Sequence, residues 1–182
     1  NKFDHSNLNA LQKVTLRAVV MAFLFYGLAA LEGMIMRTAA VIPTIPPVHG
    51  SPEHYFSIMT VHPIVGIFGS TYQLVFGAFM FLVPMLTKKP LYSVKLANWV
   101  WLLITIGTAL SWIAAFAWNY APLYTLYWPL PADTQQFKTI GGIVFILGVA
   151  LIMLGTFGFI YNIYATIFAR VGVHKNKTMR EL

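Results

Sequence analysis

Residues 55–86 read YFSIMTVHPIVGIFGSTYQLVFGAFMFLVPML, and this apolar stretch decides the fold class. Between Ile58 and Leu86 there is no Asp, Glu, Lys or Arg. As a helix rising about 1.5 Å per residue, that run would be about 43 Å long, whereas the hydrocarbon core of a bilayer is about 30 Å thick. The stretch therefore predicts a transmembrane helix that is longer than the hydrocarbon core requires.

The composition of the whole chain excludes a soluble domain with a polar exterior. Of its 182 residues, 58% are hydrophobic and only 9% are charged, a balance that is typical of integral membrane proteins. The absence of cysteine excludes disulfides, thiolate metal sites and cysteine nucleophiles. We predict one all-α transmembrane module over residues 1–182, with four helices at about 14–41, 58–86, 96–118 and 139–169.

The net charge of +7 is distributed as a membrane topology signal. Most of the 12 Lys and Arg residues lie before the first span, between the second and third, or after the fourth; the exceptions are Arg37 and Lys138. The positive-inside rule then places both termini in the cytoplasm, and the distribution argues against a nucleic-acid surface. The first span is about twice as long as the apolar core of a signal peptide, so we expect a retained anchor.

His62 is the residue in the second span that needs an explanation, because ionisable groups are costly inside a bilayer. At 100° per residue, small or polar residues fall within about 60° of its direction and leave that face almost bare: Gly66, Gly69, Gln73 and Gly77. Such a face allows close packing of helices, with His62 as a polar contact between them. Alternatively, imidazole is a common axial ligand of haem iron, and a flat macrocycle could lie there. We expect Pro63 to bend the helix beside this side chain.

Glu32 and Arg37 interrupt the first apolar run. Five residues place them about 140° apart on a helix, so they should not be each other's main partner. Arg37 lies near the outer end, where it is either an interfacial cation or the partner of a specific anion. Glu32 lies deeper and should be protonated or paired with a group on another helix. Proton movement through Glu32 and a structural hydrogen bond both remain open.

A proline-rich connector, VIPTIPPVHGSPEHY at residues 41–55, joins the first two spans and is expected to be ordered or extended. His49, Glu53 and His54 lie close together in it and could bind a metal. Their spacing matches no strong ligand motif, so solvated side chains are the preferred interpretation.

Aromatic and glycine patterns describe the last two spans. Tryptophans toward both ends of the third span fit the aromatic belts of membrane interfaces: Trp99, Trp101, Trp112 and Trp118. In the fourth span, small residues at every seventh position predict a seam for close helix packing: Gly141, Gly148 and Gly155, with Asn162 continuing the row. We expect helices of a partner to lie against this seam and against the bare face of the second span.

Three parts of the sequence resemble subunit I of the haem–copper oxidases. TVHPIVG at 60–66, followed by FLVP at 81–84, is similar to the second helix of that family. MIMRTA at 34–39 resembles the arginine-bearing end of its first helix. LYTLYWPLP at 123–131 is similar to the segment after the third helix, most of all in the B-type oxygen reductases. The resemblance makes the chain helices I–IV of a usual twelve-helix bundle.

The resemblance also implies roles for individual residues. It makes His62 one of two axial ligands of a low-spin haem, of a or b type, and Arg37 a polar contact at the haem edge. It places Tyr124 and Tyr127 near the haem propionates. The second axial ligand, a copper site and a second haem would belong to further helices, so the chain would not be active by itself.

The implied function is that of a proton-translocating terminal oxidase, which passes electrons from cytochrome c or quinol to oxygen in the cell membrane of a prokaryote. The implied partners are the remaining oxidase helices or subunits, a subunit II-like electron-entry protein and membrane lipid. A nitric oxide reductase-like subunit and a non-catalytic membrane subunit of a respiratory complex remain alternatives. The residues do not specify the haem type or the electron donor.

Overall fold

A computed structural model describes residues 9–120 and 139–168, and these ranges are helical with no strand. The helices are α1 (Ala10–Ala39), α2 (Pro52–Pro63), the π-helix η2 (Ile64–Tyr72), α3 (Gln73–Thr87), α4 (Val94–Trp118) and α5 (Thr139–Phe168). Because α2, η2 and α3 follow one another without a gap, they form one rod. The described part of the chain therefore contains 4 rods that are long and apolar enough to cross a membrane, which confirms the predicted all-α class.

Side-chain caps fix where three of these rods begin. Asn9 accepts a hydrogen bond from the backbone N–H of Gln12, and the Gln12 side chain accepts one from the Asn9 N–H in return. Ser51 caps α2, and Ser93 caps α4, each through its hydroxyl oxygen. These contacts satisfy N–H groups that the first turn of a helix leaves without a partner.

The first two rods begin earlier than the sequence predicted. α1 starts at Ala10 rather than near Val14, and the second rod starts at Pro52 rather than near Ile58. The Ser51 cap and a proline in the first turn, where its missing N–H costs nothing, explain the second difference. The last residues of the expected connector, His54 among them, are therefore helical.

The middle of the second rod is a π-helix, which the sequence analysis did not predict. Pro63 comes directly before η2 and has no N–H to donate. In a π-helix the backbone bonds join residues five apart rather than four, so each turn is wider. The angular positions calculated at 100° per residue are wrong beyond Ile64 for this reason.

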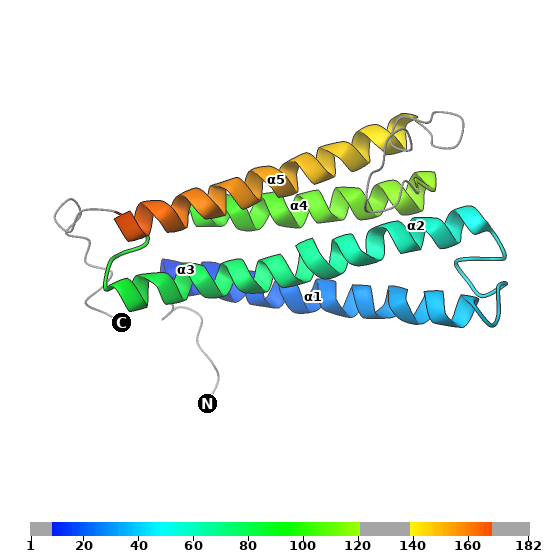
Figure 1. Ribbon diagram of the computed structural model, residues 1–182, viewed down its shortest axis with the longest axis horizontal. Coiled ribbons are helices and arrows are strands. Elements are labelled where there is room, and N and C mark those ends of the chain that lie inside the picture. Colours follow the sequence, from blue (N-terminus) through cyan, green and yellow to red (C-terminus); the bar gives the residue numbers. More distant parts are fainter. Residues whose placement is uncertain (1–8, 121–138, 169–182) are drawn as a thin grey trace.

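The rods form two antiparallel pairs, with α1 beside the α2–η2–α3 rod and α4 beside α5 (Figure 1). The second pair packs closely at its glycines: a Cβ atom on Gly148 would lie 2.5 Å from Ser111 Oγ and 2.6 Å from the Gly107 carbonyl oxygen. A Cβ on Gly155 would lie 2.7 Å from Ile104. The predicted seam is confirmed, but α4 of the same chain covers it, so the expectation of a partner helix there is wrong.

Asn162 attaches the α3–α4 connection to α5. Its side chain is fully buried, accepts a hydrogen bond from Ser93 N–H at 3.0 Å and donates one to the Ser93 carbonyl at 2.9 Å. Thr166, one turn further, accepts a bond from the Tyr92 N–H at 3.0 Å. The residue that continues the glycine row therefore holds the start of α4 against α5.

Candidate functional site

His62 points from α2 toward the backbone of α1. Its Nδ1 lies 2.9 Å from the Ala29 carbonyl oxygen. A carbonyl oxygen can only accept, so Nδ1 carries the proton and donates. In the neutral imidazole this leaves the free lone pair on Nε2, and Nε2 makes no hydrogen bond within the described residues. The side chain as a whole is 37% exposed.

Gly33 provides the surface on which the imidazole ring lies. A Cβ atom built on this residue would lie 3.3 Å from Cε1 of His62 and 3.9 Å from both ring nitrogens. Contacts of 3.3 Å are tighter than ordinary van der Waals distances. The glycine in α1 therefore lets the ring approach the helix closely enough for Nδ1 to reach Ala29.

Glu32 is buried beside the same ring, with 2% of its surface exposed. Its Oε1 accepts a hydrogen bond of 2.8 Å from the indole N–H of Trp112 in α4. Its Oε2 lies 3.9 Å from His62 Nδ1 and has no hydrogen-bond partner among the described residues. The expected pairing of Glu32 with a group on another helix is confirmed. Proton movement through Glu32 stays a prediction.

Sequence reasoning assigned Trp112 to an aromatic belt and gave no role to Ala29 or Gly33. The indole of Trp112 is half-buried and donates into the bundle, so the belt assignment is wrong for this residue. A usable signal was Glu32 itself, because a carboxyl at that depth requires a donor from a neighbouring helix.

The bare face predicted below His62 is filled by other helices of the chain. A Cβ atom on Gly69 would lie 2.8 Å from both Phe25 and Thr108, and one on Gly77 would lie 2.8 Å from Ala18. Gln73 is buried and donates to the Trp101 carbonyl and to Thr105. These positions serve helix packing, so a macrocycle resting on them, or a partner helix covering them, is excluded.

The other predicted site residues lie apart from His62 or outside the described ranges. Arg37, in the last turn of α1, is exposed and makes no hydrogen bond or ion pair within the described residues. Tyr124 and Tyr127 fall outside the residues that the structure describes. The described ranges contain no group of three or more His, Asp or Glu side chains that could hold a metal ion. His49, in the connector between the first two rods, is exposed.

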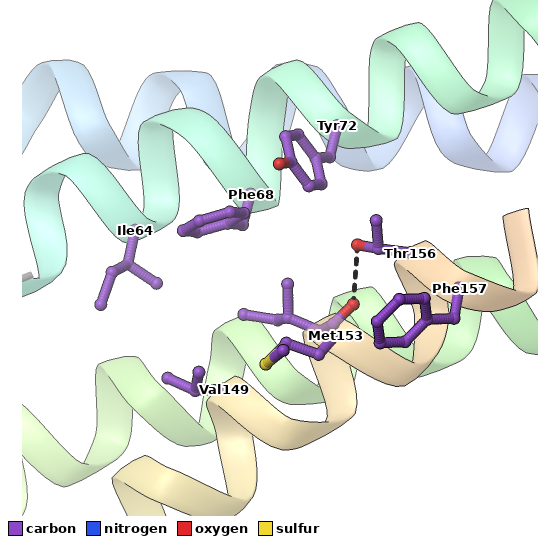
Figure 2. Close-up of a pocket in the computed structure, with 8 residues that line it drawn as sticks. Ile64, Phe68, Tyr72, Val149, Met153, Thr156 and Phe157 are labelled. Atoms are coloured by element: carbon purple, nitrogen blue, oxygen red, sulfur yellow. Dashed lines mark hydrogen bonds between the residues drawn. The ribbon is translucent and has the colours of Figure 1, made fainter. Parts of the chain in front are cut away.

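An apolar pocket of about 290 Å³ lies between η2 and α5 (Figure 2). Its polar atoms are the hydroxyls of Tyr72 and Thr156, and Thr156 donates to the Ile152 carbonyl, as the dashed line marks. The lining residues are Ile64, Phe68, Tyr72, Val149, Ile152, Met153, Thr156 and Phe157. His62 does not line this pocket, so the pocket and the histidine site are separate.

The geometry at His62 fits a metal ligand. Histidines that bind metals usually donate their other ring N–H to a carbonyl or carboxylate, which fixes the tautomer and the ring orientation. Here the Ala29 carbonyl takes that role, and Nε2 makes no hydrogen bond within the described residues. An imidazole held in this way can serve as an axial ligand of haem iron.

Residues 13–181 match the profile of the family described as "Cytochrome C and Quinol oxidase polypeptide I". The chain belongs to this family. It is 31% identical over 175 residues to a cytochrome c oxidase subunit 1 homolog of Agrobacterium tumefaciens, across 83% of this chain and 28% of the relative. It is 30% identical over 171 residues to cytochrome c oxidase subunit 1 of Rhodobacter capsulatus, across 84% of this chain and 29% of the relative. The family to which the sequence motifs pointed is thereby confirmed.

The chain spans less than a third of the length of these oxidase polypeptides. The match begins at residue 13, within α1, extends beyond the end of α5 and includes His62, Glu32 and Arg37. The printed descriptions name no subclass, so the likeness to the B-type oxygen reductases stays a prediction.

Proposed function

We propose that this chain is the haem-binding N-terminal portion of subunit I of a respiratory haem–copper oxidase, and that His62 supplies one axial ligand of its low-spin haem. The observation that carries the proposal is the free Nε2 of an imidazole whose Nδ1–H is held by the Ala29 carbonyl. Family membership and the four membrane-spanning rods support the same proposal.

The haem, when bound, would supply one-electron chemistry between an external donor and the oxygen-reducing centre. The residues of this chain hold and orient it. His62 presents a neutral imidazole through Nε2, Ala29 keeps the proton on Nδ1, and Gly33 leaves room for the ring.

The remaining parts of the proposal concern the assembly. Cytochrome c or quinol would be the electron donor and oxygen the acceptor, in the cell membrane of a prokaryote. A second axial ligand, the copper site and a second haem would come from further helices, and a subunit II-like protein would deliver electrons.

The test is the low-spin haem of the purified assembly. In His62→Ala the low-spin signal should be lost from the reduced-minus-oxidised spectrum, because iron loses an axial ligand while the apolar spans stay intact. His49→Ala, in the exposed connector, is the matched control and should keep the signal. An unchanged low-spin haem in His62→Ala would overturn the ligand assignment.

The same preparation tests the function. Oxygen consumption with cytochrome c or quinol as donor, compared with consumption of nitric oxide, separates an oxidase from a nitric oxide reductase-like complex. Mass spectrometry of the copurified polypeptides identifies the partners. A preparation that contains no haem would favour the non-catalytic membrane subunit instead.

Arg37 is proposed to contact the edge of the same haem. A nearby cation favours the electron-rich reduced state, so Arg37→Ala should lower the midpoint potential of the low-spin haem without removing it. Redox titration measures this shift, with Lys13→Ala at the other end of α1 as the control. If the potential does not change, Arg37 is an interfacial cation.

A further inference from the structure

We infer that Glu32, held in place by Trp112, is a positioning residue for His62: it fixes the tautomer and the electron-donating strength of the imidazole without touching the iron. The inference rests on the proposed function, since it assigns a role toward the haem that His62 is proposed to bind. The burial of Glu32 in the bundle needs a physical reason. A carboxyl group with 2% exposure inside a membrane bundle is expensive.

Packing alone does not explain the orientation of the Glu32 carboxyl. Trp112 occupies Oε1 with a hydrogen bond of 2.8 Å, and this bond turns Oε2 toward the imidazole. Oε2 is buried, has no hydrogen-bond partner among the described residues, and lies 3.9 Å from Nδ1. The free acceptor therefore faces one specific nitrogen of one side chain.

Three neighbouring positions of α1 act on the same ring. Ala29 and Glu32 are separated by three residues, so they lie on one face of the helix, and Gly33 is next to Glu32. The Ala29 carbonyl accepts from Nδ1–H, the Glu32 Oε2 lies 3.9 Å from the same nitrogen, and Gly33 lets the ring approach. A proton on Nδ1 is favoured by both oxygens, so the lone pair stays on Nε2.

Acceptors beside the distal N–H of a metal-bound histidine make the imidazole a stronger donor. A stronger donor stabilises the more oxidised iron, so loss of Glu32 should raise the midpoint potential of the low-spin haem. Outer partners of this kind typically change metal affinity or activity by about 10- to 100-fold. We expect a shift of about tenfold in the one-electron redox equilibrium, which corresponds to about 59 mV.

The experiment compares variants of the purified assembly by redox titration and by electron paramagnetic resonance of the oxidised low-spin haem. Glu32→Gln keeps the size of the side chain and an acceptor for Trp112 but places an amide beside His62. Trp112→Phe keeps the ring and removes the donor that orients Glu32. Trp99→Phe, the same substitution at an exposed position of α4, is the control.

The expected result is a raised midpoint potential and altered low-spin g-values in Glu32→Gln and in Trp112→Phe, with haem content retained and Trp99→Phe unchanged. If His62→Ala removes the haem but both variants keep the wild-type potential and g-values, Glu32 is only a structural hydrogen-bond acceptor and the inference is overturned. If His62→Ala keeps the haem, the proposed ligand itself is wrong. Should Glu32→Gln fail to accumulate, Trp112→Phe alone decides between these outcomes.

Discussion

At Gly33 the missing side chain decides how close an imidazole can come to a helix. A Cβ atom there would already be 3.3 Å from His62 Cε1, and the two methyl groups of valine would extend further. We therefore expect Gly33→Val to displace the ring from Ala29 and to lower the low-spin haem content of the assembly. The haem-to-protein ratio from the absorption spectrum measures the effect.

Gly27→Val is the control for this prediction. Gly27 lies in the same helix, and a Cβ atom there would meet nothing within 4 Å. Equal haem contents in the two variants would mean that the ring does not depend on the space at Gly33.

The sequence singled out residues whose chemistry is costly in a membrane. His62 and Glu32 stood out because ionisable groups inside apolar runs require a reason. The residues that contact them did not stand out. Ala29 contacts His62 through its backbone carbonyl, which the residue type does not reveal, and Trp112 is the same residue type as the tryptophans of an aromatic belt. Only the arrangement of α1, α2 and α4 in space reveals these contacts.

Among the elements, the α4–α5 pair depends most on glycine. A methyl group on Gly148 would lie within 2.6 Å of two atoms of α4, one of which is a backbone carbonyl that cannot move without the helix. Overpacking of this kind costs about 1–3 kcal/mol. We expect Gly148→Ala to lower the stability of the detergent-solubilised protein by about that amount.

Unfolding in increasing concentrations of a denaturing detergent, followed by circular dichroism, measures this change. Gly27→Ala is the control, since that position faces open space and alanine is the better helix former. If Gly148→Ala is as stable as the control, the two helices accommodate the added methyl group without loss of stability, and the prediction is wrong.

The elements also show where sequence patterns fail. Hydropathy located all four rods, because the apolar content of a segment sets whether it enters a membrane. The π-helix η2 was missed because hydropathy and spacing are insensitive to whether backbone bonds join residues four or five apart. That single change redirected Gly69, Gln73 and Gly77 away from the face assigned to them.

At the scale of the whole molecule, the chain represents only part of the oxidase polypeptides of its family. It spans less than a third of the oxidase polypeptides that it matches, and its described residues form four rods that are long and apolar enough to cross a membrane. Composition predicted the membrane class and motif order predicted the family. How the rods pair was not predictable, because apolar helices in lipid are sorted by close packing rather than by hydrophobicity.

The π-helix has a consequence for comparing this chain with others. A wide turn holds about one residue more than an α-turn of the same height. A homologue whose second helix is α-helical throughout should therefore need a gap of about one position within 64–72, if its counterparts of both His62 and Gln73 are to match. An ungapped alignment would pair one of these two residues with the wrong neighbour, and would misassign every position on one side of the π-helix.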